Sequence, residues 1–228
     1  MKKLLKKICV SCFLLMSSSV FSMQGLSVIT ITTDDPEGYV EWLTKNSQVF
    51  QDAAGDDVSS SGICSPMAGG NQMNEHYVWS FHPSTSAMLS NMQFSTEDSQ
   101  RAIRKISSKR DLVRRDMWSV MKGEAVGETG TTNDQILAAD KKLNAFMDQG
   151  SSTGGISRWW PGSGIPSRFD ADLLWVQSAE SMTAWGRGAD QAVNGGGNQV
   201  AQELYGELMT CTNREVFLAD AVRISDQN

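Results

Sequence analysis

Histidine is scarce in this chain, because His76 and His82 are the only two in 228 residues. Both lie in the stretch EHYVWSFH, which alternates as a β-strand does, and both project from the same face of that predicted strand. Six strand residues span about 20 Å, so the two imidazoles are too far apart to bind one metal ion. This scarcity excludes a two-histidine metal site, and we expect no bound metal.

Motifs of the common hydrolases and phosphate-binding proteins are also missing. The sequence contains neither a G-x-S-x-G nucleophile elbow nor an HExxH zinc motif. Its triple glycine at 195–197 follows no apolar strand and lacks the Lys-Ser or Lys-Thr pair of a phosphate loop. We interpret it as a turn between two helices. The sequence motifs therefore name no catalytic residue.

No apolar run in the sequence reaches the about 20 residues that a membrane span needs. The N-terminus has four lysines in its first seven residues, an apolar segment at Ile8–Met16, and small residues around Phe21. This pattern predicts a signal peptide over residues 1–22, with cleavage after Ser22. We therefore expect an exported protein, located in the periplasm or outside the cell.

Positive charge is in deficit. The chain has 20 Lys and Arg against 26 Asp and Glu, and loss of four leader lysines leaves 16 against 26. The resulting net charge near −10 excludes a general nucleic-acid-binding protein. Seven basic residues nevertheless gather at 101–115. We interpret them as the solvated face of a helix, with binding of an anionic surface or partner as the alternative.

Only two cysteines, Cys64 and Cys211, remain after the predicted cleavage. Neither has a histidine or another cysteine close in sequence, which makes a zinc site unlikely to form from them. An exported compartment permits a disulfide, so we predict that they pair. The alternatives are two buried thiols or one catalytic thiol.

Patterning of the first half predicts the order β-α-β-β-α-β. A β-branched stretch at 26–32 is followed by Asp34-Asp35-Pro36-Glu37, which is typical of a helix start, and Gly55 marks that helix's end. In the strand that holds the histidines, Tyr77, Trp79 and Phe81 face one side. The remaining expected elements are a strand at 58–66, helices at 84–92 and 97–110, and a strand at 116–121.

The second half repeats this order with one gap. The stretch EHYVWSFHPSTSAML at 75–89 has an echo, ADLLWVQSAESMTAW, at 171–185, which places Trp175 where Trp79 stands, 96 residues earlier. We predict a signal peptide at 1–22 and two ferredoxin-like units at 23–123 and 124–228; the alternative is chance similarity. The first strand of the second unit is the weak point, because 124–132 has little apolar content.

On this element order the chain resembles the dimeric α/β-barrel superfamily, which includes antibiotic-biosynthesis monooxygenase-like and NIPSNAP-like proteins. The resemblance implies an α+β fold in which two tandem units form a fused barrel, so that a pseudo-dimeric monomer is expected. It also implies that the second strand of one unit pairs with the fourth strand of the other, which would bring Cys64 and Cys211 near one seam. Some members bind haem, so His76 or His82 could line a cavity as a haem ligand or general base.

The most unusual local cluster is Arg158-Trp159-Trp160. Stacking and charge at these residues could form a pocket for an aromatic or anionic ligand, with core or rim aromatics as the alternative. We therefore predict an exported protein that binds a small hydrophobic or aromatic ligand, or a partner, without catalysis and without a cofactor. The alternative function is a monooxygenase-like enzyme whose substrate lies in the barrel, with Trp159 or Trp160 in the pocket wall and His76 or His82 as the polar group.

Overall fold

The computed structural model describes residues 6–12, 25–69, 72–91, 96–106, 109–120, 132–149, 154–163 and 174–224. Within these ranges the side chains of residues 6–12, 120, 132–134, 149, 154–163, 211–214 and 222–224 lie outside the description. The strands are β1 (Lys6–Cys12), β2 (Gly25–Thr32), β3 (Ser60–Ala68), β4 (Glu75–His82), β5 (Asp111–Val120), β6 (Gly154–Ser163), β7 (Leu174–Ala179) and β8 (Thr210–Ile224). The helices are α1 (Pro36–Ala54), α2 (Thr85–Asn91), α3 (Glu97–Ile106), α4 (Thr132–Gln149), α5 (Met182–Asn194) and α6 (Gly197–Tyr205), with a short 3₁₀ turn, η2, at Gly55–Asp57.

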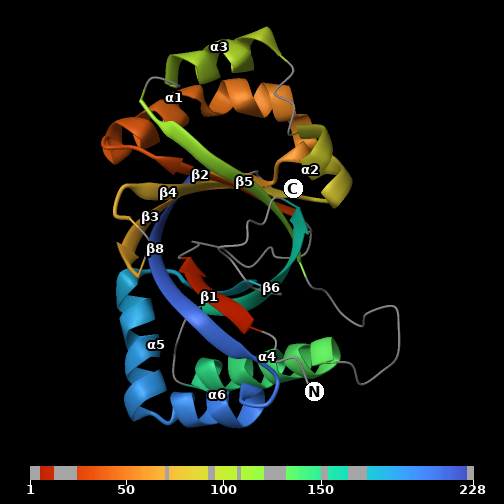
Figure 1. Cartoon of the computed structure of the whole chain (residues 1–228), viewed down its shortest axis with the longest axis vertical. Coiled ribbons are helices and arrows are strands. Elements are labelled where there is room, and N and C mark those ends of the chain that lie inside the picture. The colour runs from red at the N-terminus through yellow and green to blue at the C-terminus, as the bar shows by residue number, and fades with distance from the viewer. Residues whose placement is uncertain are drawn as a thin grey trace.

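The strands form one closed barrel in the order β1-β7-β6-β5-β2-β4-β3-β8. Helices α1, α2 and α3 cover one side of the barrel, and α4, α5 and α6 cover the opposite side (Figure 1). The predicted α+β class is confirmed. Because the strands curve around a common interior, each strand has one face toward that interior and one toward helices or solvent.

Two four-strand orders are visible around the barrel. In the first half, β5-β2-β4-β3 are antiparallel neighbours, which is the strand order of a ferredoxin-like unit. In the second half the order is β8-β1-β7-β6, and β1 occupies the position of a first strand. However, β1 comes from the N-terminus of the chain and runs parallel to both β7 and β8. Antiparallel pairs β3–β8 and β5–β6 join the two halves.

Helix α1 begins and ends at the predicted residues. The Asp35 side chain accepts a hydrogen bond from the Gly38 backbone N–H at 3.0 Å, and Pro36 takes the first helical position, where its missing N–H has no consequence. At the other end Gly55 has a φ of 56°, a backbone conformation that a residue with a Cβ rarely adopts. These local signals set the position of α1 along the sheet.

Several strands are longer than the sequence predicts. Strand β5 begins at Asp111 rather than near residue 116, and β2 begins at Gly25, one residue before the predicted start. The early part of β5 is polar, but it pairs with β2 from Thr32 onward. Hydrogen bonding to a neighbouring strand satisfies the backbone groups of such polar residues, and hydrophobic patterning does not report that contribution.

The alternation of β4 is confirmed, but the predicted equivalence of Trp79 and Trp175 is wrong. Trp79 is 5% exposed and packs in the barrel interior with Phe81. Trp175 instead stacks on Tyr205 of α6, with ring centroids 5.8 Å apart, while its neighbours in β7 face the barrel. A shift of one residue moves a strand side chain to the other face of the sheet, so the apparent match joins opposite faces.

The register of β3 and β8 does not support a bond between Cys64 and Cys211, although Cys64 is itself disulfide-bonded. Cys64 of β3 lies opposite Ala219, whereas Cys211 stands eight residues earlier on the same strand, β8. Eight strand residues span about 26 Å, and Cα atoms joined by a disulfide lie within about 7 Å of each other. The two cysteines belong to seam-forming strands as expected, but element order does not give their positions along those strands.

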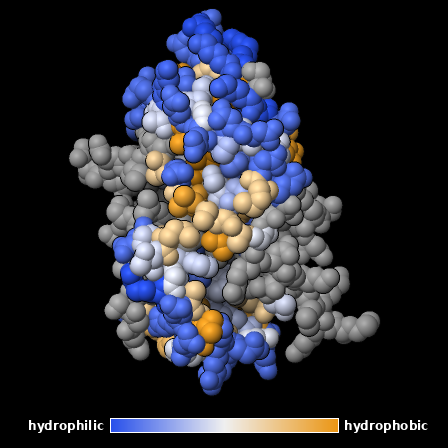
Figure 2. Space-filling model, turned by 90° about the vertical axis from the view of Figure 1, so that its left-hand side faces the viewer, coloured by the Kyte–Doolittle hydropathy of each residue, from blue (hydrophilic) through white to orange (hydrophobic). Residues whose placement is uncertain are grey.

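The outside of the β3–β8 seam carries hydrophobic side chains between two hydrophilic helical layers (Figure 2). Met67 of β3 is 48% exposed there, and Leu218 of β8 is 39% exposed.

Within the described part of the chain, no helix is both long and apolar enough to cross a membrane.

Candidate functional site

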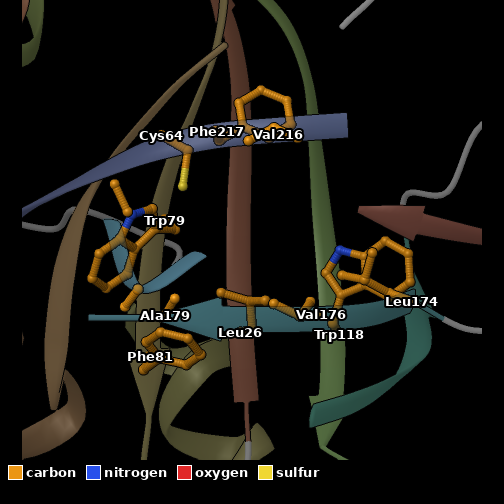
Figure 3. Close-up of a cluster of buried hydrophobic side chains, with 12 residues drawn as sticks. Leu26, Cys64, Trp79, Phe81, Trp118, Leu174, Val176, Ala179, Val216 and Phe217 are labelled. Atoms are coloured by element: carbon orange, nitrogen blue, oxygen red, sulfur yellow. The ribbon is translucent and has the colours of Figure 1, made fainter. Parts of the chain in front are cut away.

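The barrel interior holds a packed apolar core among the described side chains (Figure 3). Aromatic and aliphatic residues from β2, β3, β4, β5, β7 and β8 contribute to it: Leu26, Cys64, Trp79, Phe81, Trp118, Leu174, Val176, Val216 and Phe217. Side chains from facing strands meet in the middle of the barrel (Figure 3). The part of the barrel interior that these residues fill is therefore hydrophobic core.

Two pairs of polar side chains lie in the described core. The Arg114 guanidinium donates to the Asp116 carboxylate on β5, and both side chains are buried. The Tyr77 hydroxyl donates to a carboxylate oxygen of Glu215 at 3.2 Å, which links β4 to β8. Such pairing offsets the desolvation of charges that are removed from water. We interpret these groups as structural.

His76 and His82 do not line the barrel, contrary to the expectation for the enzyme hypothesis. They lie on the outer face of β4, which also carries Val78, and each is 2% exposed. His76 Nδ1 lies 3.2 Å from Ser65 Oγ on β3. The residues that face the barrel are the alternate ones on β4, so the pleat of the strand directs both imidazoles away from the interior.

The hydrogen bonds of His82 define a structural role. Its Nδ1 lies 2.7 Å from the backbone oxygen of Asp57, so this nitrogen carries the proton and donates it. Its Nε2 then accepts from the Ser80 hydroxyl at 2.9 Å. Burial lowers the pKa of His82, and the hydrogen bond to Asp57 opposes that effect only in part. The side chain is therefore a neutral link between β4 and η2.

Arg158, Trp159 and Trp160 all belong to β6. In the backbone register, Arg158 lies opposite Trp175 and Trp159 lies opposite Leu174, both on β7. The side chains of these three β6 residues lie outside the described part of the structure. Their proposed contribution to a ligand pocket stays a prediction.

A cavity of about 410 Å³ lies between helix α1 and the outer face of the first-half sheet, and we call it the α1 pocket. Its lining includes Ile29, Tyr39, Trp42, Leu43, Phe50, Gly62, Val78, Trp79, Ile103, Arg110, Leu112 and Arg115. The walls therefore come from α1 and α3 on one side and from β2, β3, β4 and β5 on the other. Cavities of this size and apolar lining are typical of small-molecule sites.

Helix α1 supplies the aromatic wall of the α1 pocket. Tyr39 and Trp42 are three residues apart and stack with ring centroids 5.6 Å apart, and Phe50 meets Trp42 edge-on at 5.6 Å. Residues at this spacing share one face of a helix. On the facing sheet, Ile29 and Val78 remain partly exposed although they lie beneath α1. Helix and sheet thus stay separated here.

Gly62 of β3 is part of the pocket lining and pairs with Trp79 of β4. A Cβ at this position would lie 2.6 Å from the indole Cζ2 of Trp79. Paired strand residues project from the same face, so this Cβ would point into the barrel interior and away from α1. The buried indole nitrogen of Trp42, which lines the pocket from α1, has no hydrogen-bond partner among the described residues. Such unsatisfied donors are uncommon in folded proteins and are available to a polar atom of a ligand.

The β5 end of the α1 pocket is positively charged. Arg110 donates from Nη1 to the Tyr39 hydroxyl at 2.6 Å, and its guanidinium lies 5.6 Å from the centroid of that ring. Burial raises the pKa of Tyr39 despite the opposing effect of Arg110, so the phenol is neutral at pH 7. Arg115 lies nearby on β5, and burial followed by repulsion from Arg110 lowers its pKa.

A second cavity, of about 510 Å³, lies in the other half between β7 and helices α4, α5 and α6. Trp175, Trp185 and Tyr205 line it together with several amide side chains. Two of those amides are already engaged, because Gln177 donates to Met147 and Gln191 donates to the Phe146 backbone. The described part of the chain has no group of three or more His, Cys, Asp or Glu arranged to hold a metal ion.

Sequence reasoning did not identify the α1 pocket. The apolar stripe of α1 is visible in the sequence, but the same stripe predicts a helix packed directly on its sheet. A stronger signal is available in the residue types, because three aromatic residues of α1, Tyr39, Trp42 and Phe50, exceed what a short core contact requires. The basic residues Arg110 and Arg115 were interpreted only as part of a solvated helix, whereas they precede and belong to β5.

No family model matches the sequence, and no curated protein is similar to it. By structure, the chain is similar to a proposed monooxygenase from Lactobacillus acidophilus, with a TM-score of 0.50, 9% identity, and coverage of 88% of this chain and 95% of that chain. A proposed monooxygenase from Fusobacterium nucleatum gives a TM-score of 0.50 at 9% identity, with coverage of 90% and 94%. An anthrone oxidase-like protein gives a TM-score of 0.46 at 14% identity, with coverage of 87% and 94%.

Identities this low show the shared fold alone. The first two structures have the antibiotic-biosynthesis monooxygenase-like dimeric α/β-barrel fold, and the similarity extends over nearly the whole described chain. The α/β-barrel fold that element order predicts is therefore confirmed.

Proposed function

We propose that this protein binds a small hydrophobic or aromatic ligand in the α1 pocket without catalysis. The single observation that carries the proposal is a 410 Å³ cavity walled by aromatic and aliphatic side chains of α1 and the sheet. An empty apolar cavity is unfavourable because its lining atoms lack contacts on one side, so a fitting ligand gains those contacts.

The chemistry of the pocket lining favours binding over catalysis. Among the described lining residues there is no His, Cys, Asp or Glu, and the polar groups are hydroxyls, amides and two arginines. General acid-base and nucleophilic catalysis require a titratable group within hydrogen-bond reach of the substrate. Serine without an adjacent base is a weak nucleophile, so the lining suits recognition of a ligand.

A fluorescent apolar probe, N-phenyl-1-naphthylamine, tests the proposal. We expect saturable binding by the full chain and energy transfer from the pocket tryptophans to the probe. The variant Val78→Phe adds bulk to the pocket floor and is expected to weaken probe binding about tenfold or more. Gln51→Trp adds bulk from the helix side of the same pocket and is expected to act in the same direction.

The matched control is Val193→Phe, because Val193 is 71% exposed on α5 and does not line either cavity. This control should bind the probe as the unchanged chain does. Circular dichroism melting identifies variants that fail to fold. Absence of saturable binding by the unchanged chain, or unchanged binding by both folded pocket variants, would contradict the proposal.

A monooxygenase-like activity is the second candidate, and the similarity of fold to two proposed monooxygenases supports it. In this alternative the substrate is a small aromatic or hydrophobic molecule held near Trp159 or Trp160 of β6. Oxygen uptake by the purified protein with a panel of dihydroxyaromatic compounds tests the activity. An absorbance spectrum of the same sample tests for a bound haem or flavin. No uptake above the rate of a heat-denatured sample would remove this candidate.

We further propose that the chain is an exported, pseudo-dimeric monomer, with a signal peptide at 1–22 and two duplicated units at 23–123 and 124–228. The similar strand orders of the two halves support the duplication. N-terminal sequencing of the secreted or periplasmic protein tests cleavage after Ser22, and light scattering tests the monomer. A cytosolic protein that retains Met1 would contradict export.

A further inference from the structure

This inference rests on the proposed function of the α1 pocket and narrows its ligand. We infer that the ligand is an amphipathic carboxylate whose carboxylate group lies between Arg110 and Arg115 and whose apolar part lies along α1.

Arg110 differs from Arg101 and Lys109, two other positively charged residues of the first half, in the groups that it contacts. Arg101 pairs with Glu97 and Asp98, and Lys109 lies 3.9 Å from a carboxylate oxygen of Asp35. Arg110 has no carboxylate within salt-bridge distance among the described residues, and it contacts the hydroxyl and ring of Tyr39. A guanidinium has five N–H donors, so most remain available for an anion.

Arg115 adds a second positive charge to the same end of the pocket. It lies opposite Ile29 in the β2–β5 register, and Ile29 is itself part of the pocket wall. Paired residues of antiparallel strands project from the same face, which explains why Arg115 reaches the α1 pocket. Burial and the neighbouring Arg110 both lower its pKa, which shows that the local environment disfavours two positive charges. A bound anion would relieve that repulsion.

The remainder of the lining defines what is attached to the anionic group. Lining residues run from Leu112 and Arg115 on β5 across β2 and β4 to Gly62 on β3. Four neighbouring strands cover about 14 Å at the normal strand spacing. Away from the arginines this path is bounded by Trp42, Phe50 and Val78. The pocket therefore suits an elongated apolar chain or ring system with one charged end.

The residue types of the pocket lining also favour a negatively charged ligand over a positively charged or neutral one. The described residues that line the pocket include no carboxylate, so a cationic ligand would find no opposite charge there. A neutral ligand would fill the apolar part but give the Arg110 guanidinium no negative charge to bind. Planar guanidinium groups match carboxylates with paired hydrogen bonds, which favours this anion over a spherical halide.

The test compares two ligands of equal chain length, decanoate and decanol, by isothermal titration at pH 7.5 and low salt. We expect decanoate to bind the full chain at least about tenfold more tightly than decanol. Arg110→Gln and Arg115→Gln should each reduce the ratio of decanoate affinity to decanol affinity about threefold or more, with both ligands measured on each variant. Arg110→Lys should keep part of the preference, because the charge remains and the planar fork is lost.

Arg101→Gln is the matched control, because it removes one positive charge from the exposed face of α3, where Arg101 pairs with Glu97. The preference for decanoate should survive this change. Equal binding of decanoate and decanol by the unchanged chain overturns the inference and leaves the proposed pocket intact. Binding of neither ligand, together with no binding of the naphthylamine probe, overturns the proposed function itself. An equal loss of preference in Arg101→Gln shows a general charge effect and also overturns the inference.

Discussion

At the scale of single residues, the two histidines show how scarce residues can draw attention to the wrong place. Sequence patterning correctly places His76 and His82 on one face of β4, but only the packing of α1 and η2 shows that this is the outer face. Both imidazoles are buried and hydrogen-bonded to neighbours on the same side of the sheet. Their chemistry then affects stability more than function.

Burial of the histidines predicts a pH-dependent stability. Burial lowers the pKa of both His76 and His82 below the usual value of 6.5, so the unfolded chain binds protons more readily than the folded one. Their stabilising contribution is complete above pH 6.5 and is lost as the pH falls below it toward the folded-state pKa. The free energy of unfolding, measured by urea titration at pH 7.5, 6.5 and 5.5, should decrease toward acid.

The variant His82→Asn is the comparison for that experiment, since asparagine keeps hydrogen-bonding groups but does not titrate. It should have a shallower decrease between pH 6.5 and 5.5 than the unchanged chain. Identical slopes would show that other groups cause the pH dependence.

A buried hydrogen bond in the second half gives another prediction at this scale. The Tyr205 hydroxyl of α6 donates to a carboxylate oxygen of Asp140 of α4 at 2.6 Å, and both residues are buried. Tyr205→Phe removes the donor, so we expect a loss of about 1–3 kcal/mol in the free energy of unfolding. Tyr77→Phe removes a longer contact, 3.2 Å to Glu215, and should lose less. A smaller loss for Tyr205→Phe than for Tyr77→Phe would contradict this ranking.

At the scale of elements, the relation between α1 and its sheet matters more than either alone. Capping residues fix the ends of α1, and alternation fixes the faces of β4. The space between them depends on side chains from α1 and from several strands. The structure therefore shows a cavity where helix and strand patterns predict a closed interface.

Glycine positions allow a direct test of this local packing. Gly62→Ala places a Cβ 2.6 Å from the Trp79 indole and against the backbone of β8, so we expect a loss of about 1–3 kcal/mol. Gly186 in α5 has no atom within 4 Å of a new Cβ, and Gly186→Ala should stabilise by about 0.5–1 kcal/mol. Thermal and urea unfolding measure both changes. Equal effects of the same sign would show that the predicted crowding at Gly62 is absent.

At the scale of the whole molecule, closure of the barrel depends on the N-terminal strand. β1 lies between β7 and β8 and pairs with both, in the position where the second half has no first strand of its own. The same residues, 6–12, form part of the predicted signal peptide. Cleavage after Ser22 would therefore remove a strand from the barrel and change the pairing of β7 and β8.

Deletion of residues 1–22 tests that dependence. Without β1 the facing edges of β7 and β8 lose their hydrogen-bond partners, and we expect their amide hydrogens to exchange at least about tenfold faster. Amides of β2 and β4, which pair with other strands, should exchange as before. Hydrogen exchange followed by mass spectrometry measures both regions. Unchanged protection of β7 and β8 would show that another segment takes the place of β1.

The sequence by itself determined the local features of this protein. Capping residues set the ends of α1, alternation set the two faces of β4, and element order indicated an α+β barrel, because these signals depend on neighbours within a few residues. The tertiary structure alone decided which face of β4 meets the barrel and where Cys64 and Cys211 lie along their strands. It also decided that Trp175 lies on the face of β7 that points away from the barrel. Register and cavities arise from contacts between residues far apart in the sequence, and a one-residue shift in register reverses every side chain of a strand.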